Sequence, residues 1–237
     1  MLKFIPMPRF SRLDVLNRII EVGLVPIFTH SDAALTCKVV DACAAGGASV
    51  FEFTNRGDHA IDVFQTLEAH CRRSQPQVIL GVGSIVEAST AALFVARGAN
   101  YIVSPSFNPC VAEFCNRRKI PYLPGCMTVT EIGNAEASGV EIVKIFPCEA
   151  AGGPAFLKAL LGPSPWTRAL PTGIENATRE SLTEWIQAGA SALGVGRALF
   201  GGNAIEHGDF TVIQHRAQEI LGWIQEAKAA ALKAKGK

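Results

Sequence analysis

A single lysine interrupts the apolar run at residues 140–147. The residues around Lys144 are mostly β-branched or aromatic, and a proline ends the run, so the pattern predicts a short and largely buried strand. Burial disfavours the charged form of an amine, and a neutral lysine amine is a nucleophile that can form a Schiff base with a carbonyl. Lys144 is therefore a candidate imine-forming residue. The alternative is a lysine at a strand end whose ammonium group reaches water.

Three polar residues, Glu52, Thr54 and Arg56, alternate with other residues in a second strand-like segment. The two-residue period of a strand places all three on one face, which we expect to point inward. Unpaired buried charge is costly, so one interpretation is a structural Glu52–Arg56 pair. In the functional interpretation, Arg56 binds a substrate carboxylate through its planar guanidinium and Glu52 transfers protons beside Lys144.

Strands and helices alternate along the whole chain. Short apolar runs predict strands at 24–29, 49–57, 78–84, 101–105, 121–126, 140–147, 168–173 and 192–196. Helical spacing predicts helices at 11–22, 32–45, 58–73, 86–97, 109–118, 128–138, 153–161 and 178–188. Strict alternation indicates a parallel sheet, and eight units indicate an α/β fold with a closed (β/α)₈ (TIM) barrel. An open doubly wound sheet would instead carry a glycine fingerprint after the first strand, which residues 29–32 lack.

The length of 237 residues, 49% of them hydrophobic, suits one domain of this class. We expect an N-terminal helical segment at 1–23, the barrel at 24–202 and a C-terminal helical extension at 203–237.

Composition excludes several function classes. A net charge of +1 gives no electrostatic basis for binding nucleic acid. No apolar run approaches the roughly 18 residues that a membrane span needs, and the N-terminus lacks a leader pattern. The seven cysteines form no paired motif, which indicates free thiols in a reducing compartment and favours the cytoplasm. The five histidines form no obvious cluster at strand ends, so we expect no metal.

The other expected strand ends carry small or hydroxyl-bearing residues, among them Ser84, Pro105, Thr172 and Gly173. In parallel barrels, reactive groups gather where strands end and the following loops begin. Small and hydroxylic residues there suit a narrow pocket for a short oxo-acid.

Taken together, the strand-end motifs resemble a known family. The motifs are, in order, Glu52–Arg56, Gly81–Ser84, Ser104–Pro105, Pro124–Gly125, Lys144–Pro147, Pro171–Gly173 and Gly194–Gly196. They are similar to those of the class I 2-keto-3-deoxy-6-phosphogluconate (KDPG) and 4-hydroxy-2-oxoglutarate (KHG) aldolases, over about residues 20–200. The resemblance implies a homotrimeric (β/α)₈ barrel that releases pyruvate by retro-aldol cleavage, without a cofactor.

The resemblance also implies residue roles. Lys144 matches the imine-forming lysine, Glu52 the general acid/base and Arg56 the carboxylate-binding arginine. Thr172 and Ser84 match hydroxyl positions at the pyruvyl end, although the family usually has threonine in place of Ser84.

Four further residues complete the expected substrate pocket. Pro105 and Phe146 match pocket walls in the family. We add Thr54, from its place on the Glu52 face, and Gly173, from its place at a strand end.

Two positions depart from the family pattern. Ile174 stands where a second glycine often follows Pro-Thr-Gly, and Arg197 stands where the family has a phosphate-binding serine. Arginine can bind a phosphate or a second carboxylate, whereas isoleucine does not allow the close backbone approach of glycine. The pyruvate half of the site therefore matches the family and the distal half is altered.

The substrate remains open at this point. It is 2-dehydro-3-deoxy-6-phosphogluconate, 4-hydroxy-2-oxoglutarate or both, with glyceraldehyde 3-phosphate or glyoxylate as the aldehyde product. The alternatives are a related aldolase for an unphosphorylated 2-oxo acid, a non-catalytic barrel that binds a small molecule, and a metal-dependent lyase.

Overall fold

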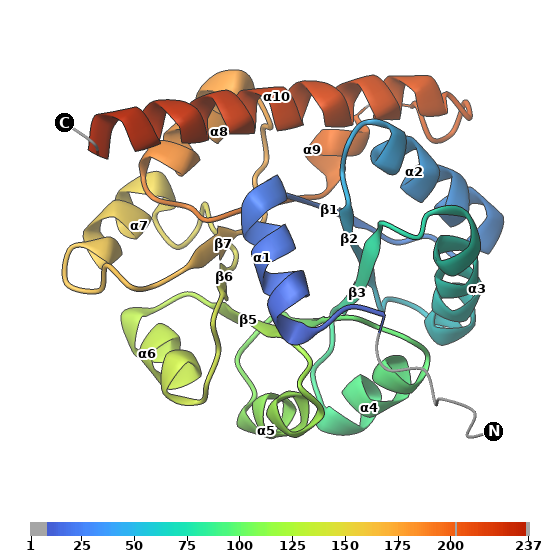
Figure 1. Ribbon diagram of the computed structural model, residues 1–237, viewed down its shortest axis with the longest axis horizontal. Coiled ribbons are helices and arrows are strands. Elements are labelled where there is room, and N and C mark those ends of the chain that lie inside the picture. Colours follow the sequence, from blue (N-terminus) through green and yellow to red (C-terminus); the bar gives the residue numbers. More distant parts are fainter. Residues whose placement is uncertain (1–8, 202, 236–237) are drawn as a thin grey trace, which may run out of the picture.

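The computed structural model describes residues 9–201 and 203–235, which form an eight-stranded parallel sheet surrounded by helices (Figure 1). The strand order is β7-β6-β5-β4-β3-β2-β1-β8. β7 and β8 are the first and last strands in this order. A single parallel bridge between Thr172, which follows β7, and Gly194 of β8 brings the ring almost to closure. The predicted (β/α)₈ fold is therefore confirmed. The parts of the expected segments at 1–8, 202 and 236–237 lie outside the described residues.

Each predicted strand and helix occurs. The strands are β1 (Leu24–Phe28), β2 (Val50–Thr54), β3 (Ile79–Gly83), β4 (Ile102–Ser104), β5 (Tyr122–Cys126), β6 (Val143–Ile145), β7 (Ala169–Pro171) and β8 (Leu193–Val195). The helices are α1 (Arg12–Val22), α2 (Ala33–Ala45), α3 (Ala60–Ser74), α4 (Ala88–Ala96), α5 (Pro109–Arg118), α6 (Val129–Ala137), α7 (Gly153–Leu161), α8 (Arg179–Gln187), α9 (Arg197–Phe200) and α10 (Phe210–Lys235). Several strands are shorter than predicted because the polar and glycine-containing ends leave the hydrogen-bonded ladder.

Local sequence explains where the first helices begin. Ser11 accepts from the backbone N–H of Asp14, whose side chain in turn accepts from the backbone N–H of Ser11, so the two form a capping box before α1. Asp32 accepts from the N–H groups of Ala34 and Leu35 at the start of α2. These caps satisfy N–H groups that a helix leaves without partners in its first turn.

Two apolar clusters lie on opposite faces of the sheet. The outer one fills the space between strands and helices and includes Phe51, Phe53 and Val143. The inner one occupies the barrel interior and joins Val50 and Ile142 of the strand region to α1. Alternate residues of each strand therefore enter different cores, as the two-residue period requires.

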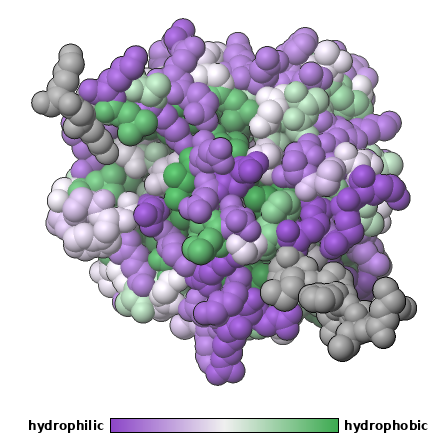
Figure 2. Space-filling model, viewed as in Figure 1, coloured by the Kyte–Doolittle hydropathy of each residue, from purple (hydrophilic) through white to green (hydrophobic). Residues whose placement is uncertain are grey.

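Helix α1 closes the N-terminal end of the barrel, where it lies across the strands (Figure 1). Its buried residues Val15, Leu16 and Ile19 belong to the inner cluster. Viewed from the same side, this end of the molecule is covered mostly by hydrophilic side chains, with hydrophobic ones exposed between them (Figure 2).

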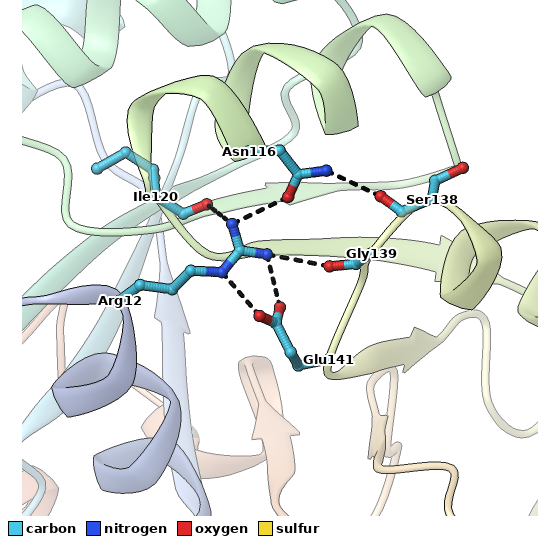
Figure 3. A network of polar contacts seen from close by, with 6 residues as sticks. All are labelled: Arg12, Asn116, Ile120, Ser138, Gly139 and Glu141. Carbon is cyan, nitrogen blue, oxygen red and sulfur yellow. Dashed lines mark hydrogen bonds and ion pairs between the residues drawn. The ribbon is translucent and has the colours of Figure 1, made fainter.

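Arg12 attaches α1 to the loops that precede β5 and β6 (Figure 3). Its guanidinium donates two hydrogen bonds to the Glu141 carboxylate, at 2.8 and 2.7 Å. It also donates to Asn116 Oδ1 and to the carbonyl oxygens of Ile120 and Gly139. The Arg12 side chain is only 14% exposed, so this fivefold arrangement is a largely desolvated, charge-assisted clamp.

Helix α10 packs against α8 and α2 and thereby fills the gap in the outer ring between them (Figure 1). Its buried side chains recur at alternating intervals of three and four residues: Ile213, Ala217, Ile220, Ile224 and Ala227. Gln225 and Lys228 of α10 donate to carbonyl oxygens at the end of α1. Within the described residues, no helix combines the length and apolarity needed to cross a membrane.

Candidate active site

Lys144 lies in the middle of β6 and points into the barrel. Its neighbours Val143 and Ile145 both belong to the outer cluster, so the alternating strand geometry directs Lys144 to the opposite, inner face. The residue is only 6% exposed. In the part of the chain that the structure describes, no ion pair involves Lys144, and its Nζ lies 4.7 Å from the centre of the Phe146 ring. The lysine therefore does not adopt the alternative position, at a solvent-exposed strand end.

Glu52 lies on the inner face of β2, between the outward-facing Phe51 and Phe53, and is 2% exposed. Burial raises the pKa of this carboxyl group above its ordinary value of 4.5, and the positive charges of Lys144 and Arg56 partly oppose that effect. The carboxyl is thus close enough to Lys144 to be influenced by its charge, although no ion pair joins them among the described side chains. A buried carboxyl with a raised pKa is suited to accept and return a proton.

Glycines provide the space around these groups. A Cβ on Gly83 of β3 would overlap Glu52 Oε1, and a Cβ on Gly194 of β8 would overlap Thr172 Oγ1. Gly125 is the β5 residue paired with Lys144, and a Cβ there would overlap the carbonyl of Pro105. The motifs found in the sequence therefore contain glycine where the interior would otherwise be filled.

Arg56 lies beyond the end of β2, and its inward orientation stays a prediction. β2 ends at Thr54, and the N–H of Arg56 donates to the carbonyl of Thr54 in a turn, so the two-residue period no longer applies. Arg56 is exposed at the end of the barrel, where its Nε donates to Ser84 Oγ at 3.2 Å. No Glu52–Arg56 ion pair occurs among the described residues, so the structural-pair interpretation is not supported.

Ser84 adopts φ +61°, a left-handed conformation that is uncommon outside glycine. This turn follows β3 directly and presents the Ser84 hydroxyl to Arg56. Backbone strain at the end of a barrel strand is a feature of functional sites.

Thr54 and Thr172 are both buried, and the hydroxyl of Thr172 donates to the carbonyl of Leu170. Gly173 has φ +94°, and its position lies against the Phe146 ring, which is half-buried.

Pro105 and Arg197 are exposed, Arg197 at the first residue of α9. Ile174 is buried in the outer cluster, with its side chain among the core residues. β8, β1 and β2 are neighbours in the sheet, so Arg197 and Arg56 follow strands that are separated only by β1.

Two buried cysteines near strand ends carry thiols that are weak nucleophiles at neutral pH. Cys126 is the last residue of β5 and Cys148 follows β6, and burial raises the pKa of each to about 12. Both are therefore protonated at neutral pH. All seven cysteines are free.

One polar side chain inside the barrel, that of Tyr101, does not lie at the C-terminal end of a strand, so the strand-end motifs did not indicate it. Tyr101 immediately precedes β4, and its ring belongs to the inner cluster, beside Val103. The alternation of Tyr101 and Val103 around Ile102, which lies in the outer cluster, was the signal available in the sequence.

The chain was compared with known proteins. A family described as KDPG and KHG aldolase matches residues 15–216. A 2-dehydro-3-deoxy-phosphogluconate aldolase of Pseudomonas aeruginosa is 29% identical over 211 residues, covering 89% of this chain and 92% of that protein. One of Haemophilus influenzae is 30% identical over 164 residues, covering 69% of this chain and 76% of that protein.

A solved structure supports the same assignment at the level of the fold. The KDPG aldolase of Legionella pneumophila superposes with a TM-score of 0.78 at 24% identity, covering 86% of this chain and 96% of that one. The family match spans most of the barrel, including every strand and the helix α10 as far as residue 216. The chain belongs to the KDPG and KHG aldolase family.

Proposed function

We propose that this protein is a class I aldolase that cleaves a 2-oxo-4-hydroxy acid into pyruvate and an aldehyde. The observation that carries the proposal is that two ionisable groups are buried on the inner face: the Lys144 amine on β6 and the Glu52 carboxyl on β2. Burial of both without an ion pair between them is costly for stability, and imine chemistry gives each of them a role.

The reaction begins when Lys144 Nζ attacks the C2 carbonyl of the substrate. The resulting carbinolamine takes up one proton from solvent at its hydroxyl and loses water, which gives a protonated imine. Glu52 then accepts the proton of the C4 hydroxyl, the C3–C4 bond breaks, and its electron pair moves toward the imine nitrogen to form an enamine. The aldehyde departs, a proton returns to C3, and water hydrolyses the imine to release pyruvate and the free lysine.

Other residues bind the oxo-acid end in this proposal. The exposed guanidinium of Arg56, held by Ser84, binds the substrate carboxylate. Thr54 and Thr172 line the pyruvyl portion, Phe146 and Pro105 form walls, and Gly173 leaves room beside Phe146. Arg56→Ala should weaken pyruvate binding; an unchanged pyruvate affinity would remove this role.

For the distal end, we propose that Arg197 binds an anionic group of the substrate. The relatives in Pseudomonas and Haemophilus are named for a phosphorylated substrate, which makes 2-dehydro-3-deoxy-6-phosphogluconate the first candidate here, with 4-hydroxy-2-oxoglutarate as the second. Arg197→Ser should raise activity on the 6-phosphate relative to unphosphorylated 2-oxo acids. An unchanged ratio would show that Arg197 does not set distal specificity.

The decisive experiment is reductive trapping with pyruvate and borohydride, followed by mass spectrometry of the peptide that contains Lys144. An adduct on Lys144, together with cleavage of a panel of 2-oxo-4-hydroxy acids, is the expected result. No adduct and no turnover would leave a non-catalytic binding barrel, and activity lost to a chelator without an adduct would indicate a metal-dependent lyase.

We also propose a cytoplasmic homotrimer. Seven free cysteines, six of them buried, suit a reducing compartment. The trimer is inferred from family membership, and exposed apolar side chains such as Leu93 and Val129 offer surface for an interface. Sedimentation equilibrium would test the assembly, and a monomer at micromolar concentration would contradict it.

A further inference from the structure

The chain has two tyrosines, both buried and on neighbouring parts of the sheet, but their hydroxyl groups lie in different surroundings. Tyr122 of β5 faces the outer cluster, where its hydroxyl accepts from the N–H of Asn108 at 3.1 Å and donates to the carbonyl of Ser106. Tyr101 faces the barrel interior. Its hydroxyl has no hydrogen-bond partner among the described residues.

Tyr101 lies next to Glu52 across β3. The Tyr101 ring packs directly over Gly81, where a Cβ would overlap it, and Glu52 Oε1 lies over Gly83. Gly81 is also the β3 residue paired with Glu52 in the sheet. The tyrosine and the glutamate therefore occupy successive inner positions over the same strand, Tyr101 at its middle residue and Glu52 Oε1 at its last.

The two side chains also interact electrostatically. Burial raises the pKa of Tyr101 well above its ordinary value, and the charge of Glu52 raises it further. The phenol therefore keeps its proton at neutral pH and is a hydrogen-bond donor there. A second buried hydroxyl without a partner in the described residues, Thr54 Oγ1, follows Glu52 by two residues on the same face of β2.

We propose that Tyr101 is a positioning residue for Glu52: its hydroxyl donates a hydrogen bond to a water that in turn donates one to the Glu52 carboxylate. This bridge holds the carboxylate toward Lys144 and favours its ionised form against the effect of burial. The inference rests on the proposed imine chemistry, because it assigns Glu52 the role of base. Tyr101 does not touch the reacting atoms.

The test uses pyruvate alone and does not depend on the natural aldehyde. In D₂O, an imine-forming enzyme with a working base exchanges the C3 protons of pyruvate for deuterium, which NMR follows directly. Measured at saturating pyruvate across pD, the exchange rate falls on the acid side as Glu52 becomes protonated in the pyruvate complex.

For Tyr101→Phe, we expect this acid limb to move to higher pH by about one unit, because the ionised carboxylate loses a donor. Below the limb, exchange should slow about tenfold, while borohydride trapping on Lys144 and the KM for pyruvate stay as in the parent. The matched control is Tyr122→Phe. It removes a hydroxyl with two partners, so it should lower thermal stability without moving the limb.

A second measurement keeps the ring hydroxyl in place. In the Tyr122→Phe background, biosynthetic replacement of tyrosine by 3-fluorotyrosine changes Tyr101 alone, because the chain has only two tyrosines. The fluorinated phenol is a stronger donor, so the limb should move to lower pH.

Three outcomes would overturn the assignment of Tyr101 while leaving imine formation intact. They are an acid limb that stays in place in both experiments, one that moves equally in Tyr122→Phe, and one that moves to lower pH in Tyr101→Phe. A parent protein that neither exchanges pyruvate protons nor forms an adduct would overturn both this inference and the proposed function.

Discussion

The two ends of the barrel differ in whether their buried ionisable groups form ion pairs. At the N-terminal end, α1 buries Val15, Leu16 and Ile19 against the inner cluster, and the Arg12 clamp satisfies its charge with a carboxylate and three oxygen acceptors. At the C-terminal end, Lys144 and Glu52 are buried without an ion pair between them, in space that strand glycines leave open. The first arrangement stabilises the fold, whereas the second lowers stability because it buries reactive groups without an ion pair between them.

This contrast agrees with the general division of labour in (β/α)₈ barrels, in which the C-terminal end carries chemistry and the N-terminal end stability. It also yields a test, because a change at one end should affect activity and a change at the other should affect unfolding.

The largest difference between the effect on activity and the effect on stability is expected for Lys144→Ala. Removal of the amine should lower pyruvate exchange and substrate cleavage by at least about 10³-fold, since no other group forms the imine. The fold should stay intact, because the variant removes a buried amine that forms no ion pair within the described residues. Activity and thermal unfolding are the measurements, with the exposed Lys158→Ala as control. Unfolding of the Lys144 variant would contradict the contrast.

Gly83→Ala should also act on chemistry. The added Cβ would overlap Glu52 Oε1, and displacement of a catalytic group by about 1 Å can lower the rate about 10²-fold. The control is Gly133→Ala in α6, where a Cβ meets open space and alanine favours the helix. Steady-state kinetics of both variants provide the measurement. Equal kcat values would show that Glu52 does not depend on the space at Gly83.

Arg12→Ala tests the other end. The variant leaves Glu141, the Asn116 amide oxygen and two carbonyl oxygens without their shared donor, so the free energy of unfolding should fall by about 2–3 kcal/mol. Activity per folded molecule should not change. Arg18→Ala, which breaks a surface pair with Glu21, should cost less than about 1 kcal/mol. Denaturant titration measures the free energy of unfolding of both variants. Equal losses would indicate that the Arg12 contacts contribute no more to stability than a surface ion pair.

The smallest effect concerns the dependence of stability on pH. A carboxyl whose pKa is raised by folding binds its proton more tightly in the folded state. Its contribution to stability is therefore full below the unfolded value near 4.5 and is lost as the pH rises through the folded value. Glu52→Gln should remove this loss, so the variant should gain stability relative to the parent as the pH rises, although its activity falls.

Glu131 provides the opposite sign for comparison. Hydrogen bonds from Met127 and Thr128 lower the pKa of its carboxyl, so its stabilising contribution is present at neutral pH and is lost as the pH falls. Unfolding free energies of Glu52→Gln and Glu131→Gln, measured between pH 3 and pH 8, should change in opposite directions relative to the parent. The same direction for both would contradict the assigned cost of burying Glu52.

The sequence correctly placed Glu52 and Thr54 on one buried strand, but the two-residue period that placed them does not extend to Arg56. Alternation holds only while residues belong to the hydrogen-bonded ladder, and β2 ends at Thr54. The sequence run to Gly57 did not reveal that end, because the contact of Arg56 with Ser84 depends on the neighbouring strand β3. The sequence did not indicate Tyr101 because its proposed role depends on Gly81 and Glu52, which come from two other strands.

The alternation of apolar runs and helical periods, with glycines at helix ends, was enough by itself to determine the eight-unit barrel and to place Lys144 on a strand. Those are local properties, set by side-chain period and backbone preference. Only the tertiary structure decided which helices meet: α1 with the loops before β5 and β6 through the Arg12 clamp, and α10 with α2 and α8, where it closes the outer ring. Such contacts depend on strand register and barrel closure, which join residues that are far apart in the chain.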